Sequence, residues 1–288
     1  MASSTYIQAA KAIEAFASDL PGPYGYERSI KITSAGINQH RFLISFPAVA
    51  LSYGVDLSRL LDQLCIPAEA NVDSLLSHRD IIHLGVESSA SGCVCKLYGE
   101  SAALMRQLWD QSADATGLEK PQGSQNSQDL GPSNTSSNLT TVHRALKWKL
   151  GSQSLIYSDY DWLPANDAAQ LLAHIQHYAN DFLSVVEALL SKVSCPVSDL
   201  HLLRVSEVEQ GRLSLDLNLY DSGLTVQALI EVLDGSAPSA LANSVEADRQ
   251  VLASIASEAL GHIAAGVGRD GDLFLSVYYG AQERGDFS

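Results

Sequence analysis

The chain has 288 residues, of which 46% are hydrophobic and 18% charged, and its formal net charge at pH 7 is −15. This length can bury a substantial core, and we interpret residues 1–288 as one domain. The acidic balance argues against nucleic acid or an anionic membrane surface as the main partner. No apolar run approaches a membrane span, no secretory signal is evident, and the cysteines lack zinc-site spacing, so we expect a cytoplasmic protein.

Five β-hairpins are predicted, and they recur about every sixty residues. Their turns lie near Gly36, Ser89, Ser152, Gln210 and Asp270, with alternating apolar and polar residues on both sides. Helical patterns separate them. In chain order we expect a helix over about 5–18, a hairpin over 26–46, a helix over 56–64 capped by Asp56, a hairpin over 80–100, a helix over 101–111, a hairpin over 142–162, a helix over 167–192, a hairpin over 200–220, helices over 224–233 and 245–260, and a hairpin over 262–280.

Residues 112–140 differ in composition from the rest of the chain. They are rich in Ser, Gln, Asn, Gly and Pro and have few apolar positions. Such a segment cannot bury enough apolar area to offset the entropy of ordering it. We therefore predict a flexible insertion within the domain, which could become ordered over the mouth of the fold when a large ligand binds.

The strand expected over 212–220 indicates how the sheet is arranged. Leu215 and Leu217 face one side, whereas Asp216 and Asn218 face the other. Several other strands show the same separation, and the intervening helices can cover the apolar face. Ten antiparallel strands can avoid exposed edges by closing on themselves. We predict an α+β fold: a closed ten-stranded antiparallel β-barrel of five helix–strand–strand–helix repeats, ringed by α-helices.

The polar faces of these strands gather positive charge. Five of the eighteen basic residues of the chain lie on them, namely Lys31, Arg41, Lys96, Lys147 and Lys149. Like charges held close together need a ligand that neutralises them, so the lumen is predicted to bind a polyanion. Tyrosines lie among the cations, and their rings and hydroxyls can contact a cationic species or an anion's oxygens.

A barrel of this kind, with a basic and tyrosine-lined lumen, resembles the ABBA prenyltransferases, and most closely their cyanobactin-type branch, which modifies peptides in cyanobacteria. The first hairpin carries the most specific match, with Glu27, Ser29, Lys31 and Ile32 followed at the family's spacing by Arg41 and Phe42. Gly211, Asp216 and the segment 277–279 also align with the family. The resemblance covers the whole chain, although the insertion at 112–140 and Gly280 depart from the family pattern.

The resemblance implies transfer of an isoprenyl group, dimethylallyl or geranyl, from its diphosphate to a side chain of a ribosomally made, macrocyclic peptide. It implies diphosphate contacts from Arg41, Lys96 and Lys147, with Lys31 and Lys149 as further candidates. An alternative is that one or two of these cations pair with lumen carboxylates such as Asp159 or Asp216. The residues implied to shield the isoprenyl cation are Tyr98, Tyr157, Tyr220 and Tyr278.

Glu27 matches the family position that orients the acceptor and takes its proton. The alternative is a surface carboxylate beside Arg28. The implied acceptor-binding residues are Glu27, Asp159, Asp216 and Asn218. These carboxylates favour a cationic acceptor such as Arg, while Tyr, Trp and His remain alternatives.

Magnesium is expected to arrive bound to the diphosphate, with no metal site made by the protein itself. His174 and His177 have a spacing compatible with a metal, but a helix surface explains them better because no third ligand is evident. We expect a monomer. Two other functions stay open: a prenyltransferase of small aromatic molecules, and a barrel that binds an anionic ligand without catalysis.

Overall fold

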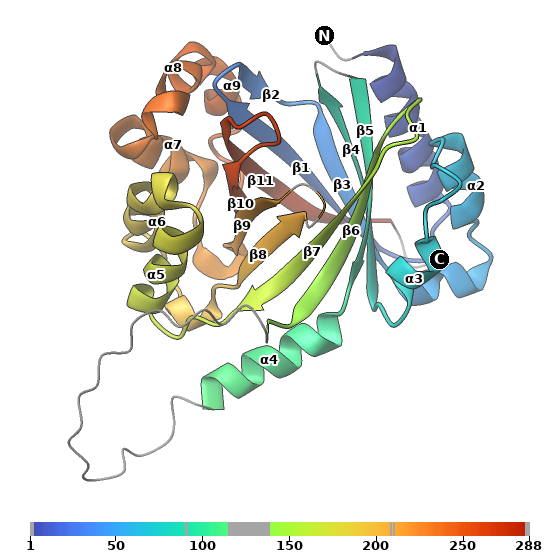
Figure 1. Cartoon of the computed structure of the whole chain (residues 1–288), viewed down its shortest axis with the longest axis horizontal. Helices are drawn as coiled ribbons and strands as arrows, with labels where there is room; N and C mark the ends of the chain where they lie inside the picture. Colours follow the sequence, from blue (N-terminus) through green and yellow to red (C-terminus); the bar gives the residue numbers. More distant parts are fainter. Residues whose placement is uncertain (1–2, 90–91, 115–138, 208, 210, 286–288) are drawn as a thin grey trace.

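The computed structural model describes residues 3–89, 92–114, 139–207, 209 and 211–285 (Figure 1). The predicted insertion at 112–140 falls mostly outside these residues. At its start, residues 112–114 belong to a helix that ends at Asp114, so the helix is longer than predicted. The turn expected near Gln210 also lies outside the described residues.

The strands form one antiparallel sheet that closes on itself, because the first strand pairs with the last as well as with its sequence neighbours. Each hairpin pairs with the next in chain order (Figure 1). The strands are β1 (Tyr24–Thr33), β2 (Gly36–Asn38), β3 (Arg41–Pro47), β4 (Ile81–Ser89), β5 (Gly92–Glu100), β6 (Thr141–Lys149), β7 (Leu155–Leu163), β8 (Leu202–Glu207), β9 (Arg212–Asn218), β10 (Leu260–Val267) and β11 (Leu273–Arg284).

Two of these strands share one position in the barrel. β1 pairs with β2 through residues 31–33 and with β3 through residues 25–28, so β2 and β3 lie end to end. The 11 strands of the sheet therefore occupy ten positions around the barrel. This arrangement confirms the predicted closed ten-stranded antiparallel barrel.

Helices cover the outside of the barrel in two groups, α1 to α3 on one side and α5 to α9 on the other (Figure 1). The side chain of Asp56 accepts a hydrogen bond from the Arg59 amide at 2.9 Å, which confirms the predicted N-cap. The α-helices are α1 (Ser4–Ser18), α2 (Leu57–Gln63), α3 (Val72–Leu76), α4 (Ala102–Asp114), α5 (Ala168–Tyr178), α6 (Leu183–Leu190), α7 (Val226–Ser236), α8 (Ser239–Ala247) and α9 (Arg249–Ser254).

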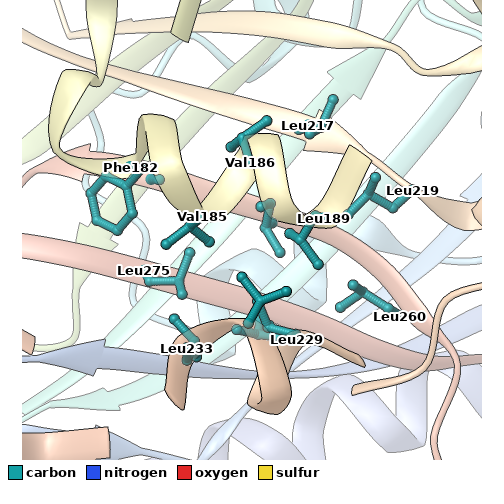
Figure 2. Packing of buried hydrophobic residues seen from close by; sticks show 14 of the residues in the cluster. Phe182, Val185, Val186, Leu189, Leu217, Leu219, Leu229, Leu233, Leu260 and Leu275 are labelled. Atoms are coloured by element: carbon teal, nitrogen blue, oxygen red, sulfur yellow. The ribbon is translucent and has the colours of Figure 1, made fainter. Parts of the chain in front are cut away.

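The larger hydrophobic core lies between the second group of helices and the outer face of the barrel. Figure 2 shows α6 and α7 packed over β9 and β11. Val185, Leu189 and Leu275 are fully buried there, and Leu217 almost so. Burial of each such side chain contributes about 1.5–3 kcal/mol. The apolar faces of the strands therefore point outward, as their alternation predicts, and the polar faces are left to line the lumen.

Helix α4 closes part of one end of the barrel. Its residues Leu104, Met105 and Leu108 pack against a small cluster that includes Trp162 and Leu203 from the strands. In Figure 1, α4 lies below the ends of β6 and β7. Met105 of α4 therefore lines the cavity from this end.

Two predicted helices are divided in the structure. The helix expected over 167–192 stops at Tyr178, because Ala179 leaves the helical conformation, with φ −149° and ψ 49°. A short 3₁₀ segment, η2 (Asn180–Phe182), then leads into α6. The pattern over 245–260 forms the end of α8, the separate helix α9 and the first residue of β10. Across the described residues, no helix has the length and apolar character needed to cross a membrane.

Candidate active site

The inner faces of the strands enclose a cavity of about 560 Å³. The predicted site residues that line it are Glu27, Arg41, Lys96, Tyr98, Asp216, Asn218, Tyr220 and Tyr278. These residues come from five strands and one short 3₁₀ helix, η5 (Tyr220–Ser222), and the sheet brings them together from positions up to 251 residues apart (278 minus 27). The rigid scaffold therefore creates one polar cavity from distant parts of the chain.

The Glu87 cluster consists of Glu87, Arg41 and Lys96. The carboxylate accepts hydrogen bonds from Arg41 Nε at 3.0 Å and Lys96 Nζ at 2.7 Å. Arg41 Nη1 also donates to Ser276 Oγ at 3.1 Å. Burial alone would raise the pKa of Glu87, but Lys96 and Arg41 outweigh it and hold that pKa well below its usual range. One carboxylate thus holds two cations in place, and a net positive charge remains at the cavity wall.

The Glu207 cluster consists of Glu207, Lys147, Arg212 and Arg269. Glu207 is only 1% exposed and receives hydrogen bonds from Lys147 at 3.1 Å, Arg212 at 2.7 Å and Arg269 at 2.8 Å. Burial opposes ionisation of Glu207, but these cations lower its pKa to about 2. Burial also lowers the pKa of Lys147, to about 8. Lys147 lies inside the barrel as predicted, yet it does not line the cavity.

Besides Lys147, two more of the five predicted diphosphate contacts lie outside the cavity wall. Lys31 is half-buried, with Nζ 4.8 Å from the centre of the Phe274 ring. Burial lowers the pKa of Lys31. Lys149 is exposed at the end of β6, close to Gly92. Arg41 and Lys96 are therefore the predicted cations that face the cavity directly.

Two predicted lumen residues face the opposite way. Tyr157 is 39% exposed, and its hydroxyl accepts a hydrogen bond from the amide of Asn71 outside the barrel. Asp159 pairs with Arg144 at 3.1 Å, also on the outer face. The predicted roles of Tyr157 as a shield and of Asp159 as an acceptor ligand are therefore wrong. In β7 the even-numbered residues point inward, and Tyr160 takes the place in the cavity wall that was assigned to Tyr157.

Aromatic rings form the middle of the cavity wall. Tyr98 and Tyr160 contact each other with ring centres 6.0 Å apart. The Tyr278 ring lies between two charged groups, 5.7 Å from the Arg41 guanidinium and stacked at 3.7 Å on His262. Burial raises the pKa of Tyr278 to about 12, so its hydroxyl remains protonated. These rings separate the Glu87 cluster from a second group of charges.

The Glu27 cluster is this second group, and it consists of Glu27, Asp216, His262 and Tyr220. Glu27 is 6% exposed, accepts a hydrogen bond from the Tyr220 hydroxyl at 2.8 Å and lies 3.5 Å from His262 Nε2. His262 Nδ1 lies 2.8 Å from Asp216. Burial disfavours the charged imidazole, but Asp216 and Glu27 outweigh it and raise the pKa of His262 to about 10. The cluster therefore holds an imidazolium between two carboxylates.

Glu27 is thus not a surface carboxylate beside Arg28. Arg28 pairs instead with Glu258, on the outside of the barrel. Gly261 makes room for the Glu27 cluster, since a Cβ atom at this position would lie only 2.6 Å from Cε1 of Tyr220 and would also clash with Glu27. Asn218 orients the end of β9, because its side-chain oxygen accepts a hydrogen bond from the Tyr220 amide at 3.1 Å.

Sequence reasoning did not identify Glu87, Glu207, His262 and Tyr160. The alternation in β4 offered a signal for Glu87, because Glu87 has the parity of Gly85 and His83 and is opposite to that of Leu84 and Val86. Glu207 and His262 show no such signal beyond strand parity, because their significance depends on which charges they meet across the barrel.

Neither a protein-family model nor a curated protein matches the chain. The structure is similar to the crystal structure of AnaPT from Neosartorya fischeri, with a TM-score of 0.52, 13% identity, and coverage of 88% of this chain and 77% of that one. Crystal structures of NotF prenyltransferase, and of NotF in complex with brevianamide F and DMSPP, align with TM-scores of 0.48, at 11% and 10% identity, over 88% of this chain and 80% and 79% of those chains. The fold is the ABBA prenyltransferase barrel predicted from the sequence.

Proposed function

We propose that the chain is a prenyltransferase that transfers an isoprenyl group from its diphosphate to a side chain of a ribosomally made peptide. One observation carries this proposal: the Tyr278 ring lies in the cavity wall between Arg41 of the Glu87 cluster and His262 of the Glu27 cluster. Prenyl transfer requires, along one cavity, a cationic end for the diphosphate, an aromatic middle for the isoprenyl cation and a carboxylate end for the acceptor. The shared fold is consistent with this proposal.

The donor diphosphate is proposed to bind at Arg41 and Lys96. Cleavage of the carbon–oxygen bond places negative charge on the leaving diphosphate, and these fixed cations stabilise that charge. Glu87 holds both cations in position before the donor arrives. Lys147 lies next to Lys96 in the register of β5 and β6 and adds positive charge from behind the wall.

The isoprenyl cation is proposed to lie against the rings of Tyr98, Tyr160 and Tyr278. Their faces stabilise positive charge and exclude water that would otherwise capture the cation. The new bond forms between the isoprenyl carbon and the acceptor atom, and the acceptor then loses a proton. Glu27 lines the cavity with a carboxylate held by Tyr220, which makes it the proposed proton acceptor.

The charge of the Glu27 cluster supports a cationic acceptor. Two carboxylates and one imidazolium leave one net negative charge, because the raised pKa keeps His262 protonated at neutral pH. A guanidinium could neutralise this charge and hydrogen-bond to Asp216 or Glu27. We propose an Arg side chain as the acceptor, with Asn218 as a further contact. Tyr, Trp and His side chains are the competing acceptors.

Magnesium is proposed to enter with the donor, bound to diphosphate oxygens. Among the described residues near the cations, Glu87 and Glu207 are already engaged by positive side chains and do not form a cage for this ion. The side chains therefore do not fit a dedicated magnesium site. Transfer measured with and without a chelator tests its requirement.

The ring-lined cavity also suits a small aromatic acceptor, which is the second candidate function. The decisive experiment incubates the protein with dimethylallyl or geranyl diphosphate and separately with Arg-, Tyr-, Trp- and His-containing cyclic peptides or with free indoles and phenols. A mass increase by one isoprenyl unit on the Arg peptide supports the proposal. Modification of free aromatics alone supports the second candidate, and donor binding without transfer to any acceptor contradicts both. Light scattering in the same buffer tests the proposed monomer.

A further inference from the structure

Three side chains outside the Glu87 and Glu27 clusters meet at the cavity wall. The Glu100 carboxylate lies 2.8 Å from His83 Nε2 and 3.4 Å from His143 Nδ1. One nitrogen or oxygen from each of the three residues lies within 4.8 Å of the others. We call His83, Glu100 and His143 the His83 cluster. Two imidazoles and one carboxylate form a donor set found in metal sites with an open coordination position.

The sheet fixes this geometry before any ligand binds. His83, Glu100 and His143 belong to three neighbouring strands, and Glu100 lies directly opposite His143 in the register of β5 and β6. All three side chains are 15–16% exposed. Main-chain hydrogen bonds therefore position the donor atoms, which lowers the cost of assembling the site.

A second observation concerns the other nitrogen of the His143 ring, the one that does not face Glu100. His143 Nε2 is buried and has no hydrogen-bond partner among the described residues. An unpaired polar atom in a protein interior is unfavourable, so such an atom calls for a partner that is missing. His201 Nε2, in the same cavity wall, is buried and unpaired in the same way. Two imidazole nitrogens near Glu100 thus lack a hydrogen-bond partner among the described residues.

The hydrogen bond made by His83 has the form of an outer-sphere contact. Its Nδ1 lies 2.7 Å from the hydroxyl of Ser45, while Nε2 faces Glu100. A metal-bound imidazole usually donates its other N–H to an oxygen, which fixes the ring and its tautomer. Ser45 lines the cavity from β3 and would hold the His83 ring in place.

We propose that His83, Glu100 and His143 bind one divalent transition-metal ion, with Zn²⁺ as the best-suited ion, and leave a coordination position open to the cavity. Donor atoms around tetrahedral Zn²⁺ are roughly 3.3 Å apart, given metal–ligand distances of about 2.0–2.2 Å. The contacts of 2.8 and 3.4 Å are close to this spacing. Mg²⁺ fits poorly, because two of the three ligands are nitrogen atoms. The site is separate from the magnesium proposed to enter with the donor.

The ion would face the interior on the strands that also carry Tyr98 and Lys96. The His83 ring lies 6.1 Å from the Tyr98 ring, and the His143 ring 5.8 Å from the Tyr160 ring. An open position here would accept water or an electron-rich group of a bound molecule. A molecule in the cavity could thus contact both the aromatic wall and the ion.

The test uses the full chain, freed of metal by a chelator and then titrated calorimetrically with Zn²⁺ alone. One ion should bind per chain. Glu100→Gln, which preserves shape, and His143→Ala should each weaken Zn²⁺ binding by more than about 100-fold. Loss of an outer-sphere partner alone costs at most about 100-fold, so a larger loss identifies a direct ligand. Ser45→Ala should weaken it by about 10–100-fold. Circular dichroism and thermal melting establish that each variant is folded.

Matched controls separate this site from adventitious binding. His177→Ala removes an exposed imidazole from α5 and should leave Zn²⁺ affinity unchanged. Co²⁺ should give the visible spectrum of a four-coordinate site without thiolate bands, and excess Mg²⁺ should not displace it. Failure of the folded wild-type chain to bind Zn²⁺, unchanged binding in both Glu100→Gln and His143→Ala, or thiolate bands would overturn the proposal. Because the titration contains neither the isoprenyl diphosphate nor an acceptor molecule, its outcome is independent of prenyl transfer.

Discussion

The hydroxyl of Tyr220 donates a hydrogen bond to Glu27 Oε1 at 2.8 Å, and it joins residues that are 193 positions apart in the chain. The contact crosses from the end of β9 to β1, over the small residue Gly261 of β10. It gives Glu27 one neutral partner, while His262 lies near the other carboxylate oxygen at 3.5 Å. The carboxylate is thereby oriented at the cavity wall.

Replacing Glu27 by Gln should slow transfer without weakening donor binding. The amide preserves size and hydrogen bonding but cannot accept the acceptor's proton, so we expect a loss of roughly 100-fold or more, the usual scale of general-base catalysis. The measurement is the transfer rate against acceptor concentration at saturating donor. Glu258→Gln is the matched control, because Glu258 pairs with Arg28 outside the barrel. Wild-type turnover in Glu27→Gln would remove Glu27 from the mechanism.

Replacing Gly261 by Ala should disturb the same group indirectly. The new methyl group would overlap Glu27 and Tyr220, so one of them must move. We expect reduced transfer with unchanged donor affinity. Gly235→Ala is the control, because a Cβ atom there meets nothing within 4 Å and the position lies in helix α7. The control should keep full activity and gain about 0.4–1 kcal/mol in stability.

The barrel could be predicted because apolar and polar residues alternate cleanly in strands such as β9 and β5. β7 lacks this signal: Tyr157, Ser158, Asp159, Tyr160 and Asp161 are polar or amphipathic at both parities. Either face could have been chosen as the inner one, and the choice of Tyr157 and Asp159 was wrong. The register against β6 and β8 settles the question, and only the folded sheet provides it.

Arg41, Lys96 and Lys147 point into the barrel as predicted, but their partners could not be predicted. Arg41 meets Glu87 from the adjacent strand, whereas Glu207 pairs with Lys147 across a sequence separation of 60 residues and with Arg269 across one of 62. Such contacts depend on side-chain length and on the curvature of the barrel. The alternation of residues along a strand gives no information about either. For the same reason, the lumen looked more basic from the sequence than it is.

Removing Arg41 or Lys96 should weaken donor binding. Loss of a charge-assisted contact costs about 1.5–3 kcal/mol, which corresponds to about 10- to 150-fold in affinity. Lys192→Ala, which breaks only an exposed pair with Glu231, is the control and should have no effect. Glu87→Gln should also weaken donor binding, because it releases both cations from their fixed positions and removes the charge that opposes the lowering of the Lys96 pKa. Unchanged affinity in both cation variants would refute the assignment.

Donor binding should take up a proton at alkaline pH. Burial, with Arg41 and Lys147, lowers the pKa of Lys96 to about 7, although Glu87 opposes the shift. Above this pH the free protein carries largely neutral Lys96, and a bound diphosphate raises the pKa again. Affinity should therefore be highest below pH 7 and fall by up to about tenfold per pH unit above it, because one proton is linked to binding.

Calorimetry in buffers of different ionisation enthalpy measures this uptake. Lys96→Arg is the informative comparison, because a guanidinium stays charged over the whole range. The Lys96→Arg variant should bind the donor diphosphate without proton uptake by residue 96. Equal proton uptake in the variant and the wild type would show that another group titrates.

His262 should make the stability of the protein depend on pH. Its pKa rises from 6.5 to about 10 on folding, because Asp216 and Glu27 outweigh the effect of burial. Because the pKa of His262 is higher in the folded than in the unfolded state, protonation of His262 stabilises the folded protein fully below pH 6.5. This stabilisation is lost as the pH rises through about 10. The free energy of unfolding should therefore decline across this interval, and His262→Gln should show a smaller decline. Urea denaturation of both proteins at matched pH values measures the difference, with His177→Gln as an exposed control that keeps the wild-type slope. Identical slopes in His262→Gln and wild type would mean that the imidazole is not held charged between the two carboxylates.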